Sequence, residues 1–215
     1  MLYYTANRIS DFFGGNIRDH LKSFKLPIVS VSQKPMKFGE NICVGKMEYC
    51  PYSIYTQILT GAKQVKTKYV VCCEDDSMYN EEHFSMEPPE DTFFYNVNRW
   101  NVNPKFYFYR RRAGMCMCVV ATKLLVETLE RRFEKYPDPI PRYPKVLNFG
   151  EPGRCEKALG LPKVKMRWIK TEMPTLTFNH RPSLGGKRRL LKSDILVESL
   201  EPWGTAKDLW AKYHR

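Results

Sequence analysis

The stretch from Tyr69 to Asp76, YVVCCEDD, is a short apolar run that ends in three adjacent carboxylates. Its apolar residues are typical of a strand that is buried on both faces, as in the centre of a parallel sheet. Three like charges in a row repel one another unless a cation or a set of donors compensates them. Because carboxylate oxygens are the ligands that hard divalent cations prefer, the stretch predicts a strand that ends at a metal and diphosphate site.

Strand-like and helix-like segments alternate before this stretch. The pattern predicts a strand, an amphipathic helix, a second strand, a helix that starts at a proline, and then the strand described above. This order is typical of a parallel sheet covered by helices. The expected segments are Leu2 to Thr5, Ser10 to Phe24, Ile28 to Ser32, Pro51 to about Gln64, and Lys68 to Cys73.

The pattern changes after Asp76. Aromatic and β-branched runs follow at short separation, which favours antiparallel strands over further crossover units. A helix is expected from Thr122, a proline-rich loop over 136–144, a short helix with Glu151 near its start, and a terminal helix in the last residues. The expected strands are Thr92 to Val97, Lys105 to Tyr109, Met115 to Ala121, Val164 to Ile169, and the extended Pro174 to His180.

The composition is that of one globular domain. The 215 residues are 43% hydrophobic, which suffices for a single core over 1–215. The predicted fold class is α/β, with a mixed, mainly parallel central sheet flanked by helices and a small antiparallel sheet. No apolar run is long enough to span a bilayer, and no leader pattern is visible, so a cytoplasmic protein is expected. The seven cysteines lack a Cys-x-x-Cys pair, which favours reduced core thiols.

The charge is distributed unevenly along the chain. The net charge is +12, yet residues 1–100 hold 11 Lys and Arg against 12 Asp and Glu, whereas residues 101–215 hold 24 against 11. Such asymmetry indicates a face that meets a polyanion. The alternative is a basic surface that only aids solubility.

Polar and basic residues also follow the first two predicted strands. In an open α/β sheet, ligands bind beyond the carboxyl ends of the strands, where these residues and the acidic triplet would meet. Their side chains can hydrogen-bond a nucleoside and its phosphates while the carboxylates hold a divalent cation. The candidates are Thr5, Asn7 and Arg8 after the first strand, and Lys34 after the second.

A parallel first half, an acidic triplet at a strand end and a mixed second half resemble the glycosyltransferases of the GT-A fold. The resemblance implies that residues 1–100 bind a nucleotide sugar such as a UDP-sugar and that residues 101–215 bind the acceptor. It also implies that Glu74 and Asp76 bind Mn²⁺ or Mg²⁺ beside Asp75, joined by His180. The alternatives are a solvated acidic turn and a structural histidine.

The same resemblance implies roles in the chemistry. Lys187 and Arg188 in the basic turn would close over the phosphates, and Glu151, with Glu156 in reserve, would act as the base that deprotonates an acceptor hydroxyl. The alternative for both glutamates is a carboxylate that complements a helix dipole. An enzyme that retains the anomeric configuration needs no such base.

Basic and aromatic residues together favour DNA as the acceptor, since cations contact phosphates and aromatic rings stack on unpaired bases. The working hypothesis is transfer of a hexose to 5-hydroxymethylcytosine, as in compact viral enzymes that modify DNA. A glycosyltransferase for a cell-surface polysaccharide or a lipid-linked glycan is the second hypothesis, and a non-catalytic nucleic-acid-binding protein is the third. The oligomeric state stays open. The candidate DNA contacts are Arg110, Arg111, Arg112, Tyr143, Lys165 and Arg189.

Overall fold

The computed structural model describes residues 1–137, 149–181 and 188–214. Its main feature is a seven-stranded sheet of order β10-β6-β9-β4-β1-β2-β3. All neighbours in this sheet pair in parallel except β9, which runs antiparallel to both β4 and β6. The α/β class and the mixed, mostly parallel sheet are thus confirmed. The strands are β1 (Leu2–Thr5), β2 (Val29–Ser32), β3 (Glu40–Cys43), β4 (Tyr69–Glu74), β6 (Thr92–Asn96), β9 (Cys118–Ala121) and β10 (Lys165–Ile169).

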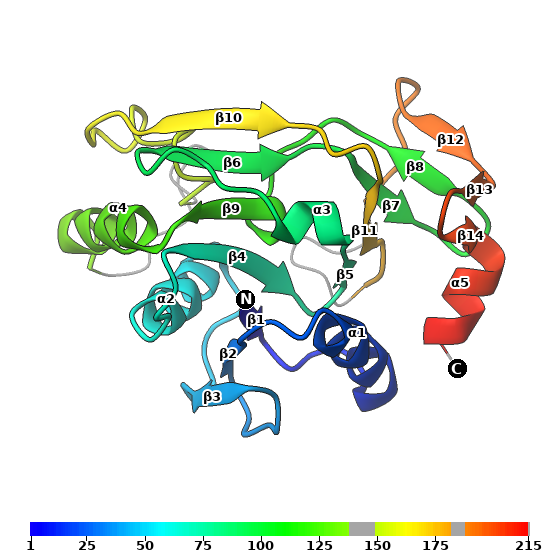
Figure 1. Ribbon diagram of the computed structural model, residues 1–215, viewed down its shortest axis with the longest axis horizontal. Coiled ribbons are helices and arrows are strands. Elements are labelled where there is room, and N and C mark those ends of the chain that lie inside the picture. The colour runs from blue at the N-terminus through cyan, green and yellow to red at the C-terminus, as the bar shows by residue number, and fades with distance from the viewer. Residues whose placement is uncertain (138–148, 182–187, 215) are drawn as a thin grey trace.

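Helices cover both faces of this sheet (Figure 1). On one face α2 packs on β1 and β2, α4 packs on β9, and the two helices pack on each other. On the other face α1 packs against β5 and α5. The helices are α1 (Asp11–Ser23), α2 (Pro51–Ala62), α3 (Glu81–Phe84), α4 (Thr122–Lys135) and α5 (Ala206–Tyr213), with β5 at Ser77–Met78.

The apolar run of β4 explains this two-sided core. Successive strand residues point to opposite faces. Val70 and Cys72 therefore join the core under α2 and α4, whereas Val71 and Cys73 join the core under α1. Because all four are buried, the strand reads as continuously apolar rather than alternating.

A second sheet continues from the carboxyl ends of the first. Its order is β12-β8-β7-β11-β5, and β5, β7 and β11 follow β4, β6 and β10 along the chain. The predicted small sheet was expected to be antiparallel, but it is mixed, because β7 and β11 pair in parallel. Its other strands are β7 (Arg99–Val102), β8 (Tyr107–Tyr109), β11 (Thr175–Phe178) and β12 (Ile195–Val197). Two further strands, β13 (Ser199–Leu200) and β14 (Gly204–Thr205), form a separate antiparallel pair.

Two local predictions were wrong. Residues 115–117 were predicted as the start of a strand, but they form a 3-10 helix that precedes β9. Residues 151–160 form turns instead of a helix, with Gly153 and Gly160 at φ of 85° and 63°, a left-handed conformation that glycine adopts readily and that interrupts a helix. The predicted loop over 136–144 lies mostly outside the described residues.

Two expectations on composition agree with the structure. The seven cysteines are free, and four of them are buried. Among the helices of the described ranges, none combines the length and the apolar character needed to cross a bilayer.

Candidate functional site

A cavity of about 700 Å³ opens beyond the carboxyl ends of β1 and β4. It brings together the acidic triplet, the segment after β1, the end of β11 and the turns after residue 149. A neighbouring cavity of about 610 Å³ shares Thr5 and Ile9 with it and extends toward the segment after β2. Of the sequence-predicted residues, the larger cavity is lined by Thr5, Arg8, Glu74, Asp75, Asp76, Arg112, Glu151, His180 and Arg188, and the smaller one by Thr5, Asn7 and Lys34.

Each carboxylate of the triplet has a different partner. The Tyr4 hydroxyl donates to Glu74 Oε1 at 2.9 Å, and the Thr5 hydroxyl donates to Asp75 Oδ2. Asp76 Oδ2 lies 3.3 Å from His180 Nε2, a contact between residues 104 positions apart. These partners come from β1, which pairs in parallel with β4, and from the segment just after β11, whose last residue, Phe178, donates through its backbone N–H to the carbonyl of Asp76.

The triplet carries more negative charge than its surroundings compensate. Desolvation, followed by repulsion from Asp76, raises the pKa of both Glu74 and Asp75 to about 7, although the bonds from Tyr4 and Thr5 oppose the shift. A cation bound here would offset that repulsion and favour the ionised carboxylates.

Two side chains of metal-ligating type meet at the wall of this cavity. Asp76 and His180 are both buried, adjacent and at the cavity wall. Within the described ranges, no three His, Cys, Asp or Glu side chains converge as a complete ligand set. Mg²⁺ is commonly held by one or two protein ligands plus phosphate oxygens and water, so a pair of this kind is compatible with such an ion.

The segment after β1 is held by its own polar contacts. Asn7 has φ of 52°, a left-handed conformation that asparagine tolerates, and its Oδ1 accepts from the backbone N–H groups of Gln33 and Lys34 at 2.8 and 2.9 Å. Asn7 thus ties the segments after β1 and β2 together. Arg8 lies 3.8 Å above the ring of Tyr49, which also lines the larger cavity.

The two candidate bases lie in different environments. Glu151 lines the cavity and lies 3.3 Å from Arg154 Nη1. Glu156 does not line it, and its carboxylate is buried against Arg132, which donates through Nε at 2.9 Å and through Nη2. Gly153 N also donates to Glu156 at 2.5 Å. Glu156 therefore holds the turns that carry Glu151.

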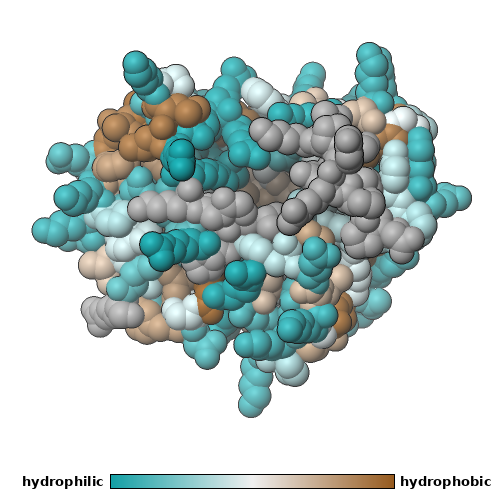
Figure 2. Space-filling model, turned by 180° about the vertical axis from the view of Figure 1, so that it is seen from behind, coloured by the Kyte–Doolittle hydropathy of each residue, from teal (hydrophilic) through white to brown (hydrophobic). Residues whose placement is uncertain are grey.

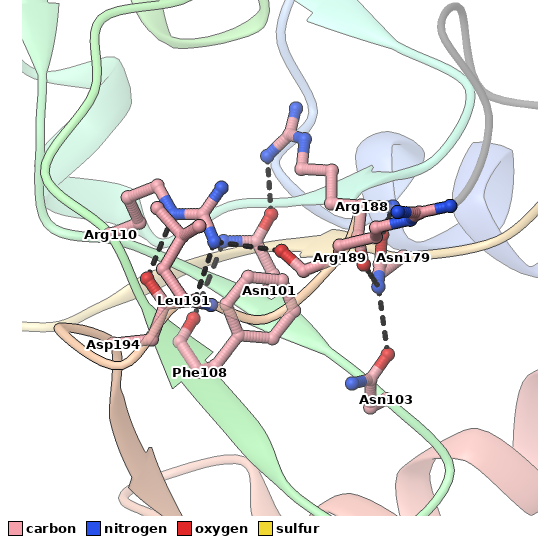
Figure 3. A network of polar contacts seen from close by, with 9 residues as sticks. All are labelled: Asn101, Asn103, Phe108, Arg110, Asn179, Arg188, Arg189, Leu191 and Asp194. Carbon is pink, nitrogen blue, oxygen red and sulfur yellow. Dashed lines mark hydrogen bonds and ion pairs between the residues drawn. The ribbon is translucent and has the colours of Figure 1, made fainter.

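The basic candidates are dispersed. Arg188 lines the cavity, donates to Asn101 Oδ1, and has a pKa lowered to about 10, chiefly by desolvation (Figure 3). Arg110 is bound to Asp194, and the Arg110 Nη2 donates to the carbonyl of exposed Arg189 (Figure 3). Exposed Arg111 lies over Trp168, and Lys165 pairs with Asp91. Tyr143 and Lys187 lie outside the described residues.

Sequence reasoning missed several residues of the cavity wall, among them Arg99, Gln57 and Tyr49. Arg99 is buried beside the triplet, donates to Cys116 Sγ at 3.2 Å, and its charge opposes the upward pKa shift of Glu74. Gln57 on α2 donates to the carbonyls of Thr5 and Val31, and Tyr49 lies in the segment before α2. Of these three residues, only Arg99 could have been noticed in the sequence, because it is a single charged residue between two strand-like runs.

No protein-family profile matches the chain, and a search of curated proteins finds no significant match.

Proposed function

We propose that the chain is a metal-dependent glycosyltransferase that transfers a hexose from a UDP-sugar, with a GT-A-like fold. The observation that supports this most is the meeting of Asp76 and His180 at a cavity beyond the carboxyl ends of parallel strands. That edge is where open α/β sheets bind nucleotides. A carboxylate and an imidazole there match the ligand types of a cation that bridges a diphosphate.

The residues have distinct roles in this proposal. Asp76 and His180 would hold Mn²⁺ or Mg²⁺, which neutralises charge on the leaving diphosphate when bound. Arg8 and Arg188 add positive charge at the cavity wall, and Tyr49 offers an aromatic face for a nucleobase. Glu151 accepts the proton from the acceptor hydroxyl if the configuration is inverted.

Calorimetry with UDP and Mn²⁺ tests the donor site. We expect metal-dependent binding that weakens at least about tenfold in Asp76→Asn, because a neutral amide is a poorer ligand than a carboxylate. Asp91→Asn is the matched control, since Asp91 is exposed and paired with Lys165 away from the cavity. The proposal would be contradicted if UDP bound equally well with and without Mn²⁺. It would also be contradicted if Asp76→Asn and Asp91→Asn bound UDP and Mn²⁺ equally well.

DNA carrying 5-hydroxymethylcytosine is the first acceptor that we propose. Its support is the charge of residues 101–215 and the exposed Arg111, Arg112 and Arg189, of which Arg112 lines the cavity. Incubation of hydroxymethylated duplex DNA with a panel of UDP-sugars and Mn²⁺ should add the mass of one hexose per modified base. An unchanged mass across the panel would remove DNA as the acceptor.

A lipid-linked glycan is a second acceptor that one observation favours. Exposed Leu190 and Leu191 follow directly after Arg188 and Arg189, so apolar side chains lie a short distance along the chain from the cavity wall. The same donor panel with a polyprenyl-phosphate-linked sugar, followed by mass spectrometry, distinguishes this acceptor from DNA.

A further inference from the structure

Four large aliphatic side chains are exposed along the edge of the five-stranded sheet, two in the turn before β12 and two on β12 itself, where consecutive residues point to opposite faces of the strand. Leu190, Leu191, Ile195 and Leu196 are 44, 54, 56 and 51% exposed. The last two belong to β12, which is the edge strand of this sheet. In Figure 2, seen from behind Figure 1, an apolar group (brown) lies over this region at the upper left, next to hydrophilic residues. We call these four residues the β12 surface.

The backbone beneath the β12 surface is held firmly in place. Arg110 donates to Asp194 through Nε at 2.8 Å and through Nη2 at 2.5 Å, and Asp194 also accepts from the backbone of Leu191 at 2.8 Å (Figure 3). Arg188 N donates to Asn179 Oδ1 at 2.7 Å. The turn that carries Leu190 and Leu191 is therefore tied to β8 through Arg110 and Asp194, and to the segment after β11 through Asn179.

Cationic and aromatic side chains flank the β12 surface. Exposed Arg189 and Lys192 precede and follow Leu190 and Leu191 in the sequence. On β10, Trp168 is 40% exposed, and the guanidinium of Arg111 lies 4.8 Å from its ring. Arg111 is the sequence neighbour of Arg110, whose side chain binds the turn that carries Leu190 and Leu191. Asp194, the acidic residue inside the turn, is already paired with Arg110.

We propose that the β12 surface docks on an anionic lipid bilayer. Aliphatic side chains that enter the acyl region, cations at headgroup level and a tryptophan at the interface are the features that interfacial membrane binding requires. A nucleic acid would satisfy the arginines but leave four aliphatic side chains in water. A second copy of the chain, meeting this face about a two-fold axis, would bring like charges together.

The docking surface is independent of the proposed activity, since vesicle binding requires no turnover. Arg188 lines the cavity and is only two residues from Leu190. A bilayer on the β12 surface would therefore lie close to the cavity wall.

Flotation of the full chain with vesicles tests the proposal. The vesicles contain phosphatidylcholine alone or with about one third phosphatidylglycerol, at low and high salt. We expect binding that needs phosphatidylglycerol and weakens with salt. Leu191→Ser/Ile195→Ser should lower the partition coefficient at least about tenfold, because two side chains no longer enter the apolar region. The control is Phe12→Ser/Leu26→Ser, which removes two apolar side chains that are 45 and 39% exposed on and after α1, away from β12.

Several outcomes would overturn the proposal. One is the absence of vesicle binding, and another is equal binding by the Leu191→Ser/Ile195→Ser variant. Binding to DNA fragments without binding to vesicles would assign this face to nucleic acid. A dimer in light scattering that dissociates in the same variant would assign it to self-association. Unchanged thermal melting of both double variants excludes unfolding as the cause of any loss.

Discussion

Replacing Glu156 by alanine separates a structural glutamate from a catalytic one. The side chains of Arg132 and Glu156 are 0 and 3% exposed, and they are joined through two guanidinium nitrogens. The variant leaves the guanidinium buried, where its Nη1 still donates to the carbonyl of Gly150 at 2.7 Å. It also removes the acceptor of Gly153 N. The cost is therefore that of an uncompensated buried charge plus one lost backbone bond.

Breaking a buried ion pair from one side typically costs about 3 to 5 kcal/mol, and this is the loss that we expect in the free energy of unfolding for Glu156→Ala. Urea denaturation followed by far-UV circular dichroism measures it. Glu156→Gln keeps an acceptor for Arg132 and should lose about half as much. Glu151→Gln, at the cavity wall, should change stability by less than about 1 kcal/mol while it lowers transfer activity.

The double variant Arg132→Met/Glu156→Leu supplies the control. Because apolar residues of similar volume need no desolvation of charge, it should be more stable than Glu156→Ala. A loss below about 1 kcal/mol in Glu156→Ala would refute the reasoning. So would abolished activity in a Glu156→Gln protein of full stability, since Glu156 would then act in the chemistry itself.

Three further predictions concern the cavity and the core. The pKa of Glu74 is about 7 in the folded protein and about 4.5 in the unfolded chain, so its contribution to stability is full below about pH 4.5 and is lost as the pH rises through 7. As the pH is raised from 5 to 8 without metal, the Glu74→Gln variant should therefore gain about 2 kcal/mol in unfolding free energy relative to the wild type. Urea titration at each pH measures this difference. Gly61→Ala places a Cβ 2.3 Å from Leu2 Cδ1, and this overpacking should outweigh the gain in helix propensity and lower stability by about 1 to 2 kcal/mol in the same assay. Tyr49→Ala should weaken UDP binding about tenfold in calorimetry if its ring stacks on the nucleobase, and an unchanged affinity would remove it from the donor site.

Local periodicity was enough to predict β1, α1, β2, α2 and β4, but it missed the edge strand β3. The helix predicted over 10–24 is Asp11–Ser23, and the helix predicted from Pro51 is Pro51–Ala62. Both have strong local signals, since Ser10 caps the first with its side chain and Pro51 occupies the first turn of the second. The strand before the triplet was predictable for the same reason, as its apolar run is short and sharply bounded.

Non-local pairing explains what the sequence did not show. The sequence favoured antiparallel strands after Asp76, and β9 is antiparallel to both of its neighbours, but nothing in residues 118–121 indicates that this strand lies in the large sheet between β4 and β6, because its neighbours are chosen by the packing of both sheet faces. The helix expected after Glu151 failed for a related reason. Two glycines there adopt left-handed conformations, which favours turns. Glu156 in these turns pairs with the buried Arg132 on α4, and that pairing cannot be inferred from the local sequence pattern.

The acidic triplet shows most clearly what only the fold decides. In the sequence its three carboxylates are equivalent neighbours, and only their different partners distinguish them. Tyr4 and Thr5 at the end of β1 donate neutral hydrogen bonds to the first two, whereas His180 from the end of β11 meets Asp76. Since β1 pairs with β4 in the large sheet and β11 pairs with β5 in the small one, the two sheets together bring these groups to one cavity. A cation is therefore expected at the junction of the two sheets, beside Asp76 rather than Glu74.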